Sequence, residues 1–310
     1  MKSIAEQRLA QLVDREDEMK NFCAMLEDPD WPRPITAIWG EGGIGKSSLL
    51  SRMIHECSVR SLAKAEVLWT DIYNYDYLAV MRRIRDGLGA DKFSEFTKLV
   101  NYFFTDQSIK VDLSVSSPIK VGEGMTMAQG SKAGVIAGVV FEPGAIVIKD
   151  QVIKDQMETM PRRDLAISDS DRMARITGQF LQDLNAAAAS GRIIIFLDAV
   201  EKAPELTQKW LWGGLFDALL QGHLDNVQFV ICGRNRPAID DRWQLLVDEE
   251  RLAPLKPEHI ADFLDRLQLN LDVTQRKIAV DTIWVASQGN PLKIANIAGE
   301  LARMWKSPNK

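Results

Sequence analysis

The chain has 310 residues, 46% apolar and 26% charged, which is enough to bury a substantial core and excludes disorder as its main state. Its 38 basic and 43 acidic side chains leave a formal charge of −5, which disfavours a dedicated nucleic-acid coat but leaves a local basic patch open. Cys23, Cys57 and Cys232 are odd in number and too widely spaced for a zinc knuckle, so we expect reduced thiols and a cytoplasmic protein.

The N-terminal segment, residues 1–34, is expected to be helical. Residues 1–20 are polar and lack an apolar signal core, and the longest uncharged apolar stretch, 134–141, is far too short to span a bilayer, so no membrane is expected. Apolar residues recur at helical spacing over 3–28, with Asp14 as the predicted cap of a second helix that begins at Arg15. Prolines at 29, 32 and 34 then end the helix.

From residue 35 the predicted strands and helices alternate. Strands are expected over 35–39, 65–71, 192–197 and 227–232, with a strand-like segment near 244–255. Helices are expected over 47–60, over 77–104 with a break near 87–91, over 171–188 and over 205–221. Strands joined by crossover helices predict an α/β domain over 35–255 with a mostly parallel sheet and helices on both faces.

A β-rich insertion interrupts this domain at about 108–157. Residues 109–116 alternate strictly between apolar and polar, and 134–148 contains β-branched runs. The five residues 147–151 are repeated directly at 152–156, which is too short a repeat for a solenoid. Two interpretations stay open: a surface hairpin of slack register, or a surface that binds another copy or a partner.

After residue 256 only helical patterns remain, over 257–267, 273–287 and 291–305. They predict a small helical domain over 256–310.

Residues 40–47, GEGGIGKS, fit the pattern G-x-x-x-x-G-K-[ST] and lie between a predicted strand and a predicted helix. Glycines allow successive backbone N–H groups to converge on phosphate oxygens, and the helix N-terminus adds positive potential. Lys46 is expected to reach the β- and γ-phosphates, and Ser47 to bind Mg²⁺. The predicted contacts of ATP or ADP in this loop are Gly40, Gly42, Gly43, Ile44, Gly45, Lys46, Ser47 and Ser48, the last without a metal role.

A metal-bound nucleotide also needs an acidic residue at a strand end. Asp198 follows five apolar residues and is the predicted second ligand of the magnesium site. Position 199 is alanine and the next carboxylate is Glu201, the candidate for water activation, so we expect slow hydrolysis. Arg234 ends the strand 227–232 and is the predicted γ-phosphate sensor, whereas Arg236 is interpreted as a solvated arginine.

Together these motifs resemble the STAND class of P-loop NTPases, the signal-transduction group that includes the nucleotide-binding switches of plant resistance proteins. Residues 12–19, LVDREDEM, are similar to the N-terminal motif of that class, with Asp14 in place of its usual glycine. The resemblance implies that Val13 and Arg15 lie beside the base and sugar of the nucleotide. Residues 196–201 and 233–234 resemble the metal-site and arginine sensor strands, and 252–263 the segment that leads into the lid helices.

Residues 289–292, GNPL, match the Gly-x-Pro-Leu turn of the class, in which the proline, here Pro291, packs against adenine. The resemblance implies a helical lid over the nucleotide and an ATP/ADP-dependent switch that controls oligomerisation or an effector, with a setting in bacterial defence or signalling. The expected partners are further copies of the chain and an effector or sensor in another domain or chain. The alternatives are an AAA-type loader or motor acting on nucleic acid, which the net acidity disfavours, and a small-molecule kinase, for which we find no acceptor base.

Overall fold

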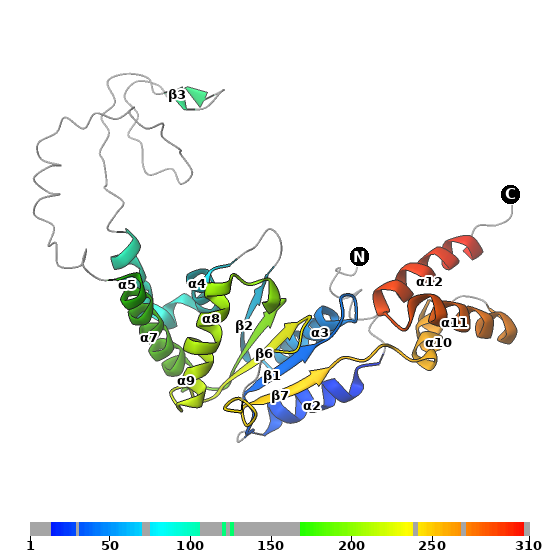
Figure 1. Ribbon diagram of the computed structural model, residues 1–310, viewed down its shortest axis with the longest axis horizontal. Helices are drawn as coiled ribbons and strands as arrows, with labels where there is room; N and C mark the ends of the chain where they lie inside the picture. Colours follow the sequence, from blue (N-terminus) through cyan, green and yellow to red (C-terminus); the bar gives the residue numbers. More distant parts are fainter. Residues whose placement is uncertain are drawn as a thin grey trace, which may run out of the picture. The chain divides into compact units, whose positions relative to one another are not determined.

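The computed structural model describes residues 14–28, 31–69, 75–105, 120–121, 125–126, 168–237, 241–267 and 271–306 (Figure 1). The chain divides into two compact units, one formed by Met1–Phe96 and Thr177–Lys310 and the other by Thr97–Ile176. The first unit contains all the described residues of the predicted nucleotide site. No helix in these described ranges is both long and apolar enough to cross a membrane.

A five-stranded parallel sheet is the framework of the first unit (Figure 1). Its strand order is β2-β5-β6-β1-β7, so β1 lies between β6 and β7. β5 and β6 are buried along their whole length, as expected of inner strands covered on both faces. The predicted α/β class with a parallel sheet is confirmed. The strands are β1 (Ile35–Trp39), β2 (Ala63–Leu68), β5 (Ile193–Asp198), β6 (Val227–Gly233) and β7 (Val247–Arg251).

Different helices cover the two faces of this sheet. On one face Phe196 of β5 contacts Phe22 of α2 (Glu16–Glu27), in a cluster that also includes side chains of α3 (Lys46–Val59). Phe196 pairs in register with Val230, so Phe229 points to the opposite face, where its ring lies 5.1 Å from that of Phe216. β1 delivers the chain to the edge of the sheet from which α3 starts.

The start of α2 differs from the prediction. The residue that caps the helix is Arg15, whose side chain makes no capping bond, so the prediction of Asp14 as the cap is wrong. Asp14 has a left-handed backbone with a φ of 54°, and its carboxylate lies 3.0 Å from Nδ1 of His259 instead of over the helix N-terminus. Glu16 accepts the Arg15 backbone N–H at 3.0 Å. The earlier helix predicted within 3–13 lies outside the described residues.

The remaining helices before β5 follow the predicted pattern closely. Asp76 caps α4 by accepting from the Ala79 N–H at 2.7 Å. The predicted break after α4 is a short 3-10 turn. The elements are α4 (Tyr77–Leu88), η1 (Ala90–Phe93), α5 (Ser94–Thr105) and α7 (Asp169–Ala188).

The helix predicted over 205–221 is present but irregular. It runs as α8 (Glu205–Trp210), a π-helical turn η4 (Leu211–Phe216) and α9 (Asp217–Leu220), after the 3-10 turn η3 (Val200–Lys202). Trp210 donates its indole N–H to Thr177 Oγ1 at 3.0 Å, and a Cβ at Gly214 would lie 3.1 Å from its ring. A pair of glycines, the weakest helix formers after proline, allows the turn to widen around this buried ring.

Three helices follow the last strand, as predicted, and we call them the lid: α10 (Pro257–Arg266), α11 (Val273–Ser287) and α12 (Pro291–Lys306). The lid has a hydrophobic cluster of its own, which includes Ile260, Phe263, Ile283 and Ile294. Asp272 and Gln275 form a reciprocal capping box at the start of α11.

The second unit includes the predicted insertion. Its described strands are β3 (Lys120–Val121) and β4 (Met125–Thr126), which form an antiparallel pair. The strands predicted over 109–116 and 134–148, and the repeat at 147–156, lie outside the described residues.

Candidate functional site

The predicted phosphate loop, Gly40–Ser47, connects the end of β1 to the start of α3. Gly43 and Gly45 have φ angles of 79° and 102°, in the left-handed region that favours glycine. A Cβ on Gly43 would lie 2.9 Å from Asn290 Oδ1 and 2.9 Å from Leu292 Cβ, so a side chain there would collide with the lid. Backbone conformation and close packing therefore both require glycine at position 43.

Lys46 is folded back onto the loop that precedes it. Its ammonium donates to the carbonyls of Gly40 at 2.7 Å and of Glu41 at 2.9 Å. Burial lowers the pKa of Lys46, and the nearby carboxylates of Glu201 and Asp198 oppose that shift. A phosphate oxygen in this loop would give the half-buried ammonium a charged partner in place of two neutral carbonyls.

Ser47 and Asp198, the two residues predicted to bind Mg²⁺, lie in contact with each other. The Ser47 hydroxyl donates to Asp198 Oδ2 at 2.8 Å, which joins the first turn of α3 to the end of β5. Burial raises the pKa of Asp198, while the Ser47 hydroxyl, the Ala199 N–H and the charge of Lys46 oppose the rise. A hydroxyl and one carboxylate are hard oxygen donors, which suit Mg²⁺ that keeps several waters and binds phosphate oxygens. The residues present therefore fit this ion.

Glu201 and Arg234 lie together at the same edge of the sheet. Arg234 donates its backbone N–H to Glu201 Oε2 at 3.2 Å, and its Nε lies 3.6 Å from Oε1. The Arg234 side chain is 63% exposed, and its guanidinium would be 4.0 Å from a Cβ placed on Gly42. The predicted sensor thus lies beside the phosphate loop. Arg236 forms an ion pair with Glu249 at 2.6 Å.

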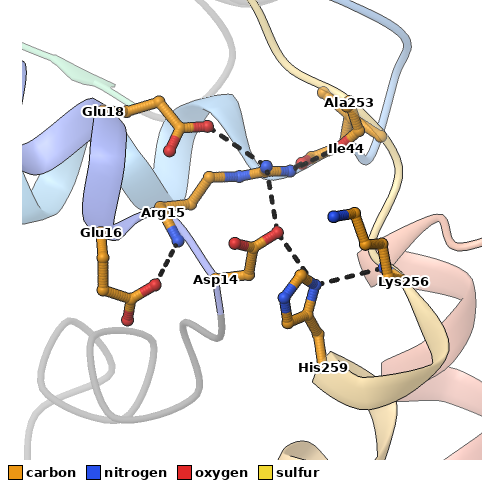
Figure 2. A network of polar contacts seen from close by, with 8 residues as sticks. All are labelled: Asp14, Arg15, Glu16, Glu18, Ile44, Ala253, Lys256 and His259. Carbon is orange, nitrogen blue, oxygen red and sulfur yellow. Dashed lines mark hydrogen bonds and ion pairs between the residues drawn. The ribbon is translucent and has the colours of Figure 1, made fainter.

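Arg15 is buried, with 3% of its surface exposed, and connects three segments (Figure 2). One of its terminal nitrogens donates to the carbonyls of Ile44 at 3.1 Å and Ala253 at 2.9 Å, and the other donates to Glu18 at 3.3 Å. The arginine thereby ties the start of α2 to the phosphate loop and to the connection that leads into the lid. Val13, its predicted partner at the nucleotide, lies outside the described residues.

Asp14 has a left-handed backbone, a conformation that aspartate tolerates better than most residues. An aspartate therefore costs little at this position, where the motif that the sequence resembles has glycine. Figure 2 shows the Asp14 carboxylate between Arg15 and His259, whose Nδ1 also lies 3.2 Å from the Lys256 backbone N–H.

The lid contacts the phosphate loop directly. Asn290 Nδ2 donates to the Gly42 carbonyl at 2.9 Å, and the Leu292 N–H donates to the Gly43 carbonyl at 3.2 Å. Sequence reasoning selected the next residue, Pro291, and missed Asn290. The available signal was an asparagine directly before a proline at a helix start, a common N-cap arrangement.

A cavity of about 490 Å³ lies between the phosphate loop and the lid. Its apolar part is lined by the lid residues Phe263, Pro291 and Ile294, and its polar part by the loop. Arg15 and Ser48, both predicted to contact the nucleotide, also line it. The predicted site residues brought together here are Arg15, Gly43, Ile44, Gly45, Lys46, Ser47, Ser48 and Pro291.

The fold of P-loop NTPases is defined by a parallel sheet, a glycine-rich loop at the N-terminus of a helix, and a strand-end aspartate within hydrogen-bonding distance of the loop serine. Here Asp198 ends β5, which β6 separates from the loop-bearing strand β1, and it accepts from Ser47. The chain has this fold.

No protein-family model matches the sequence, and no curated protein matches it. Similar solved structures include a Walker-type ATPase from Pyrococcus abyssi, at 15% identity and a TM-score of 0.49 over 94% of this chain and 68% of that one. Cdc6p from Pyrobaculum aerophilum has 14% identity and a TM-score of 0.46 over 93% of this chain and 60% of that one. A STAND protein with a tetratricopeptide-repeat sensor from Pyrococcus horikoshii has 12% identity and a TM-score of 0.40. The alignment covers 96% of this chain and 33% of that protein.

Proposed function

We propose that the chain is an ATP/ADP-dependent molecular switch in which the nucleotide lies between the α/β core and the lid. The observation that carries this proposal is the cavity whose walls come from the phosphate loop on one side and from α10 and α12 on the other. A ligand there contacts both parts at once, so its state can set the position of the lid.

Different polar residues contact different parts of the triphosphate. Loop N–H groups bind phosphate oxygens, and Lys46 leaves the Gly40 and Glu41 carbonyls for the phosphates. Ser47 and Asp198 would hold Mg²⁺, which neutralises phosphate charge when bound. Arg234 turns its exposed guanidinium toward the γ-phosphate, so that ATP and ADP place different charges against it.

Slow hydrolysis is part of the proposal. Ala199, directly after Asp198, has no carboxylate to orient a water, and Glu201 is engaged with Arg234. A long-lived ATP form suits a timer better than a motor.

The STAND resemblance extends the proposal to partners. We infer assembly into a homo-oligomer in one nucleotide state and an effector or sensor protein in another domain or chain, in a bacterial defence or signalling system, within the cytoplasm. Support comes from the order of the motifs along the chain, from Arg15 through Gly40–Ser47, Asp198 and Arg234 to Pro291.

The test measures nucleotide affinity by fluorescent-analogue titration, and molar mass by light scattering with ADP, ATP and a non-hydrolysable analogue. We expect wild type to bind and to change its assembly between ADP and ATP. Lys46→Ala should fold normally and lose binding, while Lys209→Ala, which removes an exposed lysine paired with Glu205, should behave as wild type. Wild type that binds no adenine nucleotide, or whose mass is the same with each, would contradict the proposal. ATPase stimulation by DNA or RNA with a salt-dependent gel shift would instead favour the loader or motor alternative.

A further inference from the structure

Asn290 uses both ends of one side chain at the junction of the lid and the phosphate loop. Its Oδ1 accepts from the N–H groups of Leu292 at 3.1 Å and Lys293 at 3.3 Å, which caps α12. Its Nδ2 donates to the Gly42 carbonyl at 2.9 Å. Two donors at one end and an acceptor at the other fit only this orientation of the amide. The residue is 8% exposed, so water competes little for these bonds.

The bond to Gly42 belongs to a continuous series. The carbonyls of Gly40 and Glu41 accept from Lys46, that of Gly42 from Asn290, that of Gly43 from the Leu292 N–H, and that of Ile44 from Arg15. The first two are held from within the loop by the lysine that must move to a phosphate. The last three are held from outside, by the lid and by the residue before α2.

The peptide geometry gives this series a consequence for phosphate binding. A planar trans peptide points its N–H opposite to its C=O. The Asn290 amide on the Gly42 carbonyl therefore holds the Gly43 N–H pointing away from the lid. The close approach of Asn290 Oδ1 and Leu292 Cβ to Gly43 leaves this part of the loop little room to rotate.

We propose that Asn290 is a positioning residue that couples the phosphate loop to the lid. The same side chain caps α12 and holds the loop through the Gly42 carbonyl, so a movement of the loop changes the start of α12 and a movement of α12 changes the loop. This inference rests on the proposed switch function and names the contact through which the switch acts. Pro291 lines the cavity, whereas the Asn290 side chain bonds to the phosphate loop.

Two substitutions separate the capping of α12 from the hydrogen bond to Gly42. Asn290→Ser is neutral and keeps a capping oxygen but does not reach Gly42. Asn290→Asp keeps the capping oxygens and loses the N–H donor. Asp272→Asn is the matched control, because Asp272 caps α11 in the same way, accepting from the Gln275 N–H at 2.8 Å. Asp272→Ala additionally reports the effect of losing a lid cap.

Hydrogen exchange of the Ile44 amide without nucleotide is the first measurement, because this buried N–H donates to the Glu41 carbonyl at 3.3 Å and reports whether the loop opens. We expect it to exchange about tenfold faster in Asn290→Ser than in wild type, since the loop opens more easily after the loss of one hydrogen bond that holds it to the lid. Both Asp272 variants should exchange as wild type at this amide. Equal exchange in Asn290→Ser and wild type would overturn the inference, and this result does not depend on nucleotide binding.

The second measurement is ADP affinity together with nucleotide-induced protection of the lid. Both Asn290 variants should bind ADP about tenfold more weakly and, at saturating ADP, should lose the lid protection that wild type shows. The loss of protection at full occupancy is a result that destabilisation alone does not give, since the Asp272→Ala lid should still respond. Full protection in the Asn290 variants would overturn the inference. Failure of the wild-type protein to bind ADP would overturn the proposed function. The exchange measured without nucleotide would still show whether Asn290 holds the phosphate loop.

Discussion

The hydroxyl of Ser47 donates a hydrogen bond of 2.8 Å to the carboxylate of Asp198, a residue 151 positions further along the chain. The bond joins the first turn of α3 to the end of β5 and places two oxygen ligands at one point. Asp198 is buried there, and Ser47, Ala199 and the charge of Lys46 only partly offset the cost of burying its carboxylate. The site thus carries a cost in the nucleotide-free protein that a bound cation would remove.

This cost predicts that Asp198→Asn stabilises the nucleotide-free protein at neutral pH. Because burial raises the pKa of Asp198 in the folded state, folding favours its protonated form. The stability this gives is fully present below the ordinary carboxyl pKa and is lost as pH rises through the raised value. Urea denaturation should show the advantage of the variant at neutral pH and a smaller one in acid. Magnesium-dependent ATP binding should fall in parallel.

Asp281→Asn, on an exposed position of α11, is the control for removing a charge. It should leave the pH dependence and the ATP affinity as in wild type. An Asp198→Asn protein less stable than wild type at neutral pH would show that the carboxylate is stabilised by its neighbours.

Arg15→Ala should destabilise the protein by about 2–4 kcal/mol, because it leaves two backbone carbonyls and the Glu18 carboxylate without a buried cationic donor. Arg15→Lys should recover only part of this loss, since an ammonium does not reproduce the fork of the guanidinium. Denaturant titration measures both. Arg33→Ala, which removes an ion pair whose arginine side chain is 49% exposed, should cost less than about 0.5 kcal/mol. Equal losses in Arg15→Ala and Arg33→Ala would refute the structural role given to Arg15.

The three free thiols should differ in reactivity. Burial raises the pKa of Cys57 to about 12 and that of Cys232 well above its ordinary value, so neither supplies thiolate at neutral pH. Cys23 is partly exposed. A maleimide followed by peptide mapping should label Cys23 first and the other two only after unfolding. Labelling of Cys57 or Cys232 at the rate of Cys23 in folded protein would contradict their burial, and Cys23→Ser provides the matched control.

Ala199→Gly should stabilise the protein by about 0.5–1 kcal/mol. Ala199 has a φ of 59°, a left-handed conformation that is unfavourable for alanine and open to glycine. Ala199→Val should have the opposite sign, because a β-branched side chain fits this region poorly. Thermal denaturation measures both.

The comparison is Ala24→Gly, at an exposed position within α2, where the same substitution should cost about 1 kcal/mol. If both glycine substitutions changed the stability in the same direction, the backbone conformation at position 199 could not be the explanation.

Motifs made of consecutive residues were predictable from sequence. The strand Ile35–Trp39, the phosphate loop and α3 follow one another, and their chemistry depends on neighbours in the chain. The strands ending at Asp198 and Gly233 were evident from apolar runs, and parallel pairing places their ends at one edge of the sheet. The π-helical turn at Leu211–Phe216 was not predictable, because it depends on the packing of Trp210 against α7.

By itself, the sequence determined that the chain forms a parallel β-sheet and that a phosphate loop follows its first strand. Both features come from local patterns, namely apolar runs and the spacing of glycines. Only the tertiary structure decided how that loop is held. The Asn290 amide reaches Gly42 across 248 positions and the Arg15 guanidinium reaches Ala253 across 238, and no local pattern encodes such distances. Asp14 is a further example. Its residue type and position predicted a helix cap, but in the folded chain its left-handed backbone directs its carboxylate to Arg15 and His259.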